Sequence, residues 1–387
     1  MNSPLNDAAG ATEIKFDFSP AEYQTRLAAV RRQMELRGAD VLLVDQLDHI
    51  AYLFGYLGTA ARYQAALVPL KGEPHMVVRE LDFGTFKSQS WMTSYEKCTD
   101  EEDSVVRVAQ AIKTLGAKAL AVEKDSNILT VARFAQLNRL LPDVKFVDFG
   151  GAIWEQRLIK SQEEIAYLER AAAIADAALV AGARKAVPGE KDYTVAIATY
   201  DATLRLGADN TRAAVFGSCF QVDSLHNGLS GRTFEEGGIY FIESMPQYRG
   251  YAARILRPVA IGKISPNDKS LANRIVEIQD EQITAMKVGA TAEDVDAIAR
   301  KKVLAEGLKV EFPQLSAYTL GYHAVPRTSD HTRIIAPKQQ WTLQAGMVFH
   351  VVLHAYGLPF SETVLVTNNG PRRLTQLPRT MFQGGEH

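Results

Sequence analysis

The sequence predicts an α/β domain over residues 19–155, an α+β domain over residues 156–387, and an arm over residues 1–18. In the first domain, short apolar runs alternate with amphipathic segments, which is the order of strands and helices in layered α/β folds. In the second domain, longer helical patterns precede turn-bounded apolar runs. That order favours helices packed on one side of a curved, mainly antiparallel sheet.

The composition is that of an ordinary globular protein. The chain has 387 residues, of which 47% are apolar and 23% charged, and its net charge is −2. This balance gives no electrostatic attraction for nucleic acid or an anionic membrane. Two cysteines cannot build a disulfide framework, and no run of about 18 apolar residues could span a bilayer. With no signal-peptide pattern at the N-terminus, we expect a cytoplasmic protein that acts on a small molecule.

The first domain begins with a well-marked helix. Ser19 is placed as its N-cap and Pro20 at its first position, and Gly38 follows its predicted end at Arg37. The other elements predicted in this domain are strands at 41–44, 65–69, 75–79, 119–122 and 145–149, and helices at 103–115 and 130–141.

The second domain shows a faint internal duplication. Ser161 and Glu164 form a capping box that opens a long helix. After Gly189 the chain reads VAIA (195–198), and after Gly289 it reads DAIA (296–299). Coincidence between two alanine-rich helices is the alternative, but the matching order of helix, turn and helix predicts a pseudo-twofold domain with a site between its halves. Strands are predicted at 238–243, 346–353 and 363–367.

Three segments of the second domain carry the polar residues of interest. They are FIESMPQYRGYAARILRPVAIG (241–262), TLGYHAVPRTSDHTR (319–333) and QAGMVFHVVLHAYGLPFSETVLVT (344–367). Together with KSQEE (160–164), their order and spacing resemble those of the creatinase/prolidase, or pita-bread, superfamily from about residue 20 to 378. The resemblance implies an N-terminal creatinase-like domain and a duplicated pita-bread catalytic domain.

Metallopeptidases of that superfamily hold two metal ions with two aspartates, a histidine and two glutamates. The corresponding positions in this chain hold Glu243, Arg254, Tyr322 or His323, Val352 and Ser361. Clustered carboxylates are needed to bind hard divalent ions, and arginine, valine and serine cannot supply them. The resemblance therefore implies a metal-free branch of the superfamily, and we expect no metal and no other cofactor.

Two metal-free branches are relevant, the creatinases and the ectoine hydrolases. The creatinase histidine corresponds to His226, but the two glutamates that grip a guanidinium group correspond to Leu256 and Val352, which excludes creatine. The ectoine hydrolases are more similar in Phe349-His350 and in the S-E-T-x-x-V-T pattern from Ser361. The first segment of the ectoine hydrolases also has a glutamate followed by an arginine-bearing strand, which corresponds to Glu243 and Arg257. Their second segment begins with a Gly-Tyr pair, which corresponds to Gly321-Tyr322. Residues 325–331 depart from their pattern.

The resemblance assigns roles to individual residues. The candidate catalytic residues are Glu243, His226 and His323, and the candidate substrate-binding residues are Arg62, Tyr63, Tyr322, His350, Glu362 and Arg257. In creatinase-like dimers an arginine after a Y-L-x-G-Y strand, here residues 52–56, reaches into the partner's site, and Arg62 corresponds to it. Structural alternatives remain open: a salt bridge of Glu243 with Arg254 or Arg257, a buried pair of Glu362 with an arginine, and a core histidine at 350.

The function predicted is metal-independent hydrolysis of a non-peptide C–N bond, in a cyclic amidine or amide of a small zwitterionic metabolite. The expected assembly is a homodimer in which Arg62 crosses the interface, without nucleic-acid or membrane partners. Two alternatives are a metal-dependent Xaa-Pro dipeptidase with a degenerate site, and a non-catalytic homologue that binds a small molecule.

Overall fold

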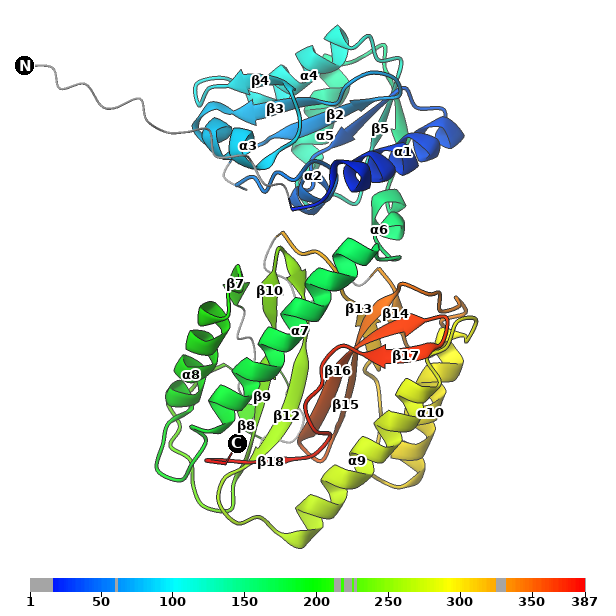
Figure 1. Cartoon of the computed structure of the whole chain (residues 1–387). Coiled ribbons are helices and arrows are strands. Elements are labelled where there is room, and N and C mark those ends of the chain that lie inside the picture. The colour runs from blue at the N-terminus through cyan, green and yellow to red at the C-terminus, as the bar shows by residue number, and fades with distance from the viewer. Residues whose placement is uncertain are drawn as a thin grey trace, which may run out of the picture. The chain divides into compact units, whose positions relative to one another are not determined.

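The computed structural model describes residues 17–59, 62–211, 217–218, 225, 228–324 and 332–386. The chain forms two compact units, Met1–Ile153 and Trp154–His387, and Figure 1 shows the elements of each. None of the helices in these described ranges combines the length and apolarity needed to cross a bilayer.

The first unit is built on a six-stranded sheet with the order β4-β3-β2-β1-β5-β6. Its central strand β1 (Val41–Val44) runs parallel to β5 (Ala119–Val122) and antiparallel to β2 (Ala65–Pro69). The other strands are β3 (His75–Arg79), β4 (Ser94–Cys98) and β6 (Lys145–Asp148). The helices are α1 (Pro20–Arg37), α2 (Leu47–Phe54), α3 (Phe83–Gln89), α4 (Ser104–Thr114), α5 (Val131–Leu140) and α6 (Ala152–Gln156).

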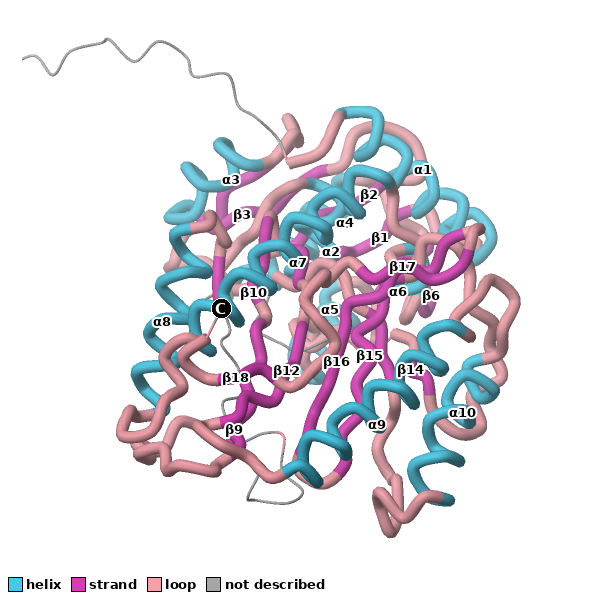
Figure 2. Tube along the Cα trace, turned by 60° about the horizontal axis from the view of Figure 1, so that its bottom comes forward, coloured by secondary structure: helices cyan, strands magenta, loops and turns pink. Residues whose placement is uncertain are grey.

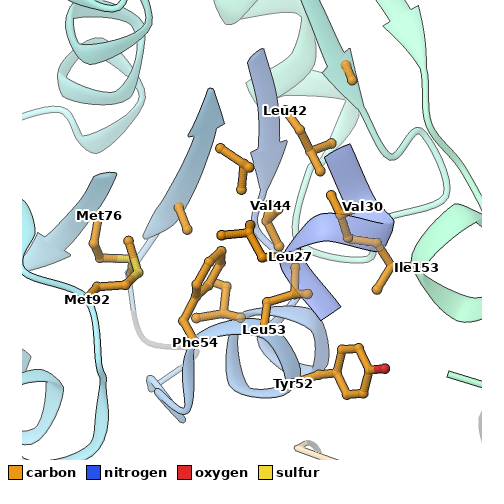
Figure 3. Packing of buried hydrophobic residues seen from close by; sticks show 14 of the residues in the cluster. Leu27, Val30, Leu42, Val44, Tyr52, Leu53, Phe54, Met76, Met92 and Ile153 are labelled. Carbon is orange, nitrogen blue, oxygen red and sulfur yellow. The ribbon is translucent and has the colours of Figure 1, made fainter. Parts of the chain in front are cut away.

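The alternation of side chains along β1 gives this sheet a core on each face. Leu42 and Val44 pack in a cluster with Leu27 and Val30 of α1, which Figure 3 shows from close by. The intervening Leu43 packs in a second cluster with residues of α4 and α5. Because β1 is buried on both faces, it reads as a continuous apolar run in the sequence.

The strands and helices predicted in this unit are present, with one error. Ser19 caps α1 by accepting a hydrogen bond from the Glu22 backbone N–H (3.2 Å), as predicted. The Y-L-x-G-Y segment is not a strand, because its first three residues complete α2 and Gly55 ends that helix with φ of 78°. All eight residues of α2 are buried, and such a short apolar run has no periodicity that separates a strand from a buried helix.

The second unit contains a nine-stranded sheet in which β14-β13-β15-β16-β12-β9-β8 are consecutive, β17 joins β16 and β18 joins β12. All its pairings are antiparallel except that of β18 with β12. Its strands are β8 (Gly217–Ser218), β9 (Ile239–Ser244), β12 (Ile255–Ala260), β13 (Ala317–Thr319), β14 (Ile334–Ile335), β15 (Val348–Ala355), β16 (Leu358–Thr367), β17 (Gly370–Arg373) and β18 (Phe382–Gln383). A smaller sheet holds β7 (Asn210–Thr211), β10 (Pro246–Tyr248) and β11 (Tyr251–Ala252).

Four helices cover one face of this larger sheet. Helix α7 (Gln162–Ala183) contacts β9 and β12, and α9 (Pro266–Thr284) contacts β15 and β16. Helices α8 (Asp192–Arg205) and α10 (Ala292–Ala305) lie beside α7 and α9, as Figures 1 and 2 show. The prediction of helices on one side of an antiparallel sheet is confirmed. We call this side of the sheet the helical face and the other side the open face.

The internal duplication is visible in matching backbone hydrogen bonds. Gly189 N–H donates to Phe234 C=O at 2.9 Å, and Gly289 N–H donates to Leu343 C=O at 2.9 Å. A second hydrogen bond runs the other way in each half. Phe234 N–H donates to Glu190 C=O, and Leu343 N–H donates to Ala290 C=O. Each half therefore joins a helix pair to a β-hairpin in the same way, which confirms the predicted pseudo-twofold arrangement.

The start of α7 is tied to the turn between β10 and β11. The predicted capping box is present, since Ser161 accepts from Glu164 N–H (3.2 Å) and Glu164 accepts from Ser161 N–H (2.9 Å). The other carboxylate oxygen of Glu164 accepts from the Tyr251 hydroxyl at 2.8 Å. The ring of Tyr251 packs edge-on against Tyr322, with centroids 5.5 Å apart, so the cap also positions this aromatic pair.

Gly250 is required at this turn for two separate reasons. Its φ is +75°, and a Cβ at this position would overlap the ring of Tyr322. We predict that Gly250→Ala lowers the free energy of unfolding by about 2–5 kcal/mol, of which about 1–2 comes from φ and about 1–3 from overpacking. Gly289→Ala is the matched control, because its φ is +85° and no described atom lies within 4 Å of its Cβ position. Urea unfolding should show the larger loss for Gly250→Ala, and equal losses would contradict a role for the Tyr322 contact.

Candidate active site

Four residues form a row across the middle of the large sheet. Glu243 of β9 is opposite Leu256 of β12, Leu256 is opposite Ser361 of β16, and Ser361 is opposite Val352 of β15. Residues directly opposite each other in antiparallel strands project on the same face. We call these four residues the central row.

A second row lies two residues farther along the strands and therefore on the same face. Tyr318 of β13 is opposite His350 of β15, which is opposite Thr363 of β16. The Thr363 hydroxyl closes the row by accepting from Arg254 N–H (2.8 Å) and donating to Arg254 C=O (2.9 Å). Arg254 is thus fixed beside the sheet just before β12 begins.

The guanidinium of Arg254 links the two rows. Its Nη2 donates to Oε1 of Glu243, and its Nη1 donates to the hydroxyl of Tyr318. That hydroxyl lies 2.8 Å from Nδ1 of His350. The four side chains are nearly removed from solvent, with residue exposures between 1% and 8%. In such surroundings the attraction between Arg254 and Glu243 is stronger than it is at a surface.

His350 is held as a neutral imidazole. Burial lowers the pKa of His350 well below its usual value, and the positive charge of Arg254 lowers it further. At neutral pH the ring therefore carries one proton and acts as one hydrogen-bond donor and one acceptor. This arrangement brings together two of the predicted site residues, Glu243 and His350.

Arg257 and Glu362, which the resemblance assigns to substrate binding, lie on the other side of the sheet from the central row. Each is next in sequence to a central-row residue, so it projects to the opposite, helical face. There Arg257 Nη2 donates to Glu362 Oε1 at 2.5 Å, and both side chains are fully buried. Glu362 also accepts from Arg379 (2.8 Å) and from the Thr375 hydroxyl. This is the buried ion pair that the sequence left open as the alternative.

The arginines around Glu362 decide its ionisation. Burial alone would raise the pKa of this carboxyl, but the charges of Arg257 and Arg379 and the hydrogen bond from Thr375 leave its pKa below the usual value. Glu362 is therefore an ionised structural anchor that ties the C-terminal segment to β12 and β16.

Tyr322 and His323 lie in the loop that pairs with the Gly250–Tyr251 turn. His323 N–H donates to Gly250 C=O at 2.8 Å, and His323 C=O accepts from Gln247 at 3.3 Å. Both residues are mostly buried. His226, the third candidate catalytic residue, lies outside the described residues, as does the divergent segment 325–331.

The two candidates of the first unit have different surroundings. Arg62 is 40% exposed, and its Nε lies 3.5 Å from Asp100 Oδ1. Tyr63 is a core residue whose hydroxyl donates to Asp45 at 3.1 Å and whose ring lies under the guanidinium of Arg133. The Tyr63 hydroxyl thus donates within the core of the first unit, and the assignment of Tyr63 to substrate binding stays a prediction.

The residues at the implied metal positions do not fit a dinuclear metal centre. Of the central row only Glu243 is a carboxylate, and it is paired with Arg254. No cluster of three or more histidine, cysteine, aspartate or glutamate residues suited to a metal occurs in the described part of the chain. A guanidinium beside the remaining carboxylate would also repel a divalent ion.

Comparisons with known proteins agree with this architecture. Residues 166–368 match the model of Metallopeptidase family M24, and residues 26–159 match that of the Creatinase/Prolidase N-terminal domain. The chain belongs to metallopeptidase family M24. The predicted creatinase/prolidase superfamily and its two-domain fold are thereby confirmed.

This M24 chain is similar to proteins with different names. An Xaa-Pro dipeptidase of Pyrococcus horikoshii is 25% identical over 90% of this chain and 96% of its own. An ectoine hydrolase of Halomonas elongata is 26% identical over 96% of this chain and 99% of its own. The crystal structure of dipeptidase PepE from Mycobacterium ulcerans is 24% identical, with a TM-score of 0.81 over 95% of this chain and 99% of that one.

Tyr318 and Thr363 belong to the polar network of the open face, and sequence reasoning assigned neither of them to the site. Tyr318 lies outside the elements predicted from the sequence. Thr363 was placed at the start of a strand and in the S-E-T-x-x-V-T pattern, without a role of its own. Both roles depend on the pairing of β13, β15, β16 and the residue before β12, which the sequence does not state.

We predict that Glu362→Gln destabilises the protein by about 3–5 kcal/mol, because it leaves Arg257 charged and unpaired in the interior. Glu169→Gln is the matched control, since Glu169 pairs with Arg372 at 2.6 Å where both side chains are more than 40% exposed. That change should cost less than about 1 kcal/mol. Calorimetric unfolding measures both, and a small loss for Glu362→Gln would show that the buried network is not a structural anchor.

A pH-dependent prediction concerns Asp45, which Tyr63 contacts. Burial raises the pKa of Asp45 to about 6, against hydrogen bonds from Ser126 and Tyr63 that lower it. A raised folded-state pKa means that the folded state binds the proton more tightly, so stability falls as the pH rises from about 4 through 6. We predict that Asp45→Asn, which mimics the protonated acid, removes about 2 kcal/mol of the fall in stability between about pH 4.5 and 7.5.

Urea midpoints of wild type and Asp45→Asn at pH 4.5 and 7.5 check this prediction. Asp176, whose pKa burial also raises to about 6, titrates in both proteins and cancels in the comparison. The same difference between the two pH values in both proteins would contradict the prediction.

Proposed function

We propose that the protein is a hydrolase that cleaves a non-peptide C–N bond in a small zwitterionic metabolite, without a metal ion in its catalytic centre. The bond is that of a cyclic amidine or amide, as in the substrate that the name of the ectoine hydrolase relative states. The observation that carries the proposal is Arg254, whose guanidinium pairs with Glu243 at a position where the superfamily resemblance implies a metal-binding carboxylate.

The donor set supports chemistry by side chains. Divalent ions in proteins are held by several oxygen ligands whose negative charges offset the metal charge. In the central row, Leu256 and Val352 are apolar and Ser361 is uncharged, so Glu243 is the one anion, and Arg254 already neutralises it. Restoring a two-metal centre would require several substitutions, whereas a carboxylate and a proton carrier are sufficient for hydrolysis.

Glu243 is the proposed catalytic carboxylate. Arg254 donates to Oε1, so we assign Oε2 to the reaction. Oε2 either takes a proton from the water that attacks the amidine or amide carbon, or attacks that carbon itself to form an acyl intermediate that water then hydrolyses. In both routes the C–N bond breaks with its electron pair on nitrogen, which takes a proton from a histidine, His323 or His226.

The proposed assembly is a cytoplasmic homodimer in which Arg62 reaches the partner's site and binds a substrate carboxylate. The exposure of Arg62 and the partial exposure of its neighbour Asp100 support this proposal, since both side chains are accessible in one chain. A guanidinium is well suited to bidentate binding of a carboxylate.

We predict that Glu243→Gln lowers turnover of a small amidine or amide by at least about 100-fold, because the amide cannot act as base or nucleophile. Ser244→Ala is the matched control, because Ser244 is the next residue of β9 and projects to the helical face. The assay uses chelator-washed protein of measured metal content with a panel that contains ectoine, other cyclic amidines, lactams and Xaa-Pro dipeptides.

The panel also separates the alternatives. Two bound metal ions per chain with chelator-sensitive cleavage of Xaa-Pro dipeptides would establish the dipeptidase function that several relatives are named for. Saturable binding without turnover of any compound would establish a non-catalytic homologue. Full activity of Glu243→Gln would remove Glu243 from the mechanism.

A further inference from the structure

Two buried polar atoms on the open face have no partner among the described residues. They are Nε2 of His350 and Oγ of Ser361, and their residues are 1% and 0% exposed. A buried polar group without a hydrogen bond is costly, so native structures keep few of them. Two such groups on one face of one hairpin point to a contact with something other than the side chains that the structure describes.

The strand register makes the residues of these two atoms neighbours on the sheet. His350 is opposite Thr363 and Val352 is opposite Ser361, so His350 and Ser361 are diagonal neighbours on the same face of β15 and β16. The Cβ atoms of diagonal neighbours are about 7 Å apart or less, which a long imidazole and a short hydroxyl can span with one small group between them. Val352 and His354, on the same face, are only partly buried, so protein does not fully cover this face.

The Arg254–Tyr318 contact constrains the hydroxyl that faces His350. An arginine N–H can only donate, so the Tyr318 oxygen accepts from Arg254. That oxygen lies 2.8 Å from Nδ1 of His350, and either group can supply the proton of this contact. When the Tyr318 O–H donates to Nδ1, the ring proton is on Nε2, the atom without a described partner, and His350 presents a donor.

We propose that His350 Nε2–H and Ser361 Oγ–H form a subsite for a carboxylate of the substrate, with Tyr318 as the positioning residue that sets the His350 tautomer. A carboxylate offers acceptor oxygens and no donor, which matches two donors. Arg254 adds a positive charge on the same face, whereas Glu243, its counter-ion, lies on the far side of Leu256 from Ser361.

The subsite rests on the proposed function only because both concern the same site of the open face. It is complete within one chain, so it does not depend on Arg62 of a second chain. A carboxylate oxygen accepts more than one hydrogen bond, so both groups can contact the same ligand. The methylene part of such a ligand would lie over the apolar side chains of Leu256 and Val352.

The first test uses acetate as the smallest carboxylate and acetamide as its neutral isostere. In full-length protein with ¹⁵N-labelled histidine, we expect the His350 ring to be in the Nε2–H form, assigned by comparison with His350→Gln. Acetate at constant ionic strength should shift its Nε2–H resonance saturably, and acetamide should bind at least about tenfold more weakly. Hydrogen bonds to charged groups are worth about 1.5–3 kcal/mol, which corresponds to this ratio.

Variants make the test specific. Ser361→Ala should weaken acetate binding about tenfold, and Tyr318→Phe should populate the Nδ1–H tautomer of His350. His354→Gln is the control, because His354 lies on the same face of β15 outside the subsite, and it should leave acetate binding unchanged. An Nδ1–H tautomer in wild type, equal binding of acetamide, or no effect of Ser361→Ala would each overturn the proposal.

A kinetic arm separates this inference from the proposed function. For a carboxylate substrate that the enzyme turns over, Ser361→Ala should raise KM about tenfold with little change in kcat, since it removes binding rather than chemistry. A loss of kcat with unchanged KM would overturn the subsite and leave the role of Glu243 intact. The opposite result is also possible. If Ser361→Ala and Tyr318→Phe change acetate binding as predicted while Glu243→Gln keeps full activity, the proposed mechanism is overturned and the subsite stands.

Discussion

The register of four central strands is the constraint on which the site depends. It places Glu243 opposite Leu256, Leu256 opposite Ser361, and Ser361 opposite Val352, and in doing so decides which side chains share the open face. A slip of one residue in β16 would move Ser361 away from the open face and bring Glu362 onto it. The duplicated loops at Gly189 and Gly289 hold the two hairpins in equivalent positions, so the fold protects this register from both sides.

Within that register, one guanidinium organises the polar side chains of the open face. Arg254 pairs with Glu243 and donates to Tyr318. Burial lowers the pKa of His350, and the positive charge of Arg254 lowers this pKa further. Arg254 can do this because Thr363 holds its backbone on both sides, at the N–H and the C=O. The guanidinium of Arg254 therefore lies beside the carboxylate of Glu243, and the two charges balance each other without a further ligand. Chemistry that depends on fixed protein dipoles needs this kind of preorganisation.

Much of the fold could be predicted because local signals agreed with it. The caps at Ser19 and Ser161 and the turn-bounded apolar runs gave helices and strands that the structure contains. The failures arose where local signals are ambiguous or where tertiary pairing decides. Residues 47–54 are all buried, and such a short segment suits a buried helix as well as a strand. Glu362 could not be separated from the site, because its partners Thr375 and Arg379 come from a distant segment.

The two faces of the sheet show what distinguishes a structural ion pair from a functional one. Both Arg257–Glu362 and Arg254–Glu243 are buried salt bridges, so burial and charge do not separate them. On the helical face, Glu362 accepts hydrogen bonds from Arg257, Thr375 and Arg379. On the open face, the ion pair adjoins His350 and Ser361, whose polar atoms have no partner within the described residues. We therefore propose the substrate site beside the open-face pair, because the charge of that pair is balanced while the hydrogen-bonding groups next to it are unused within the described residues.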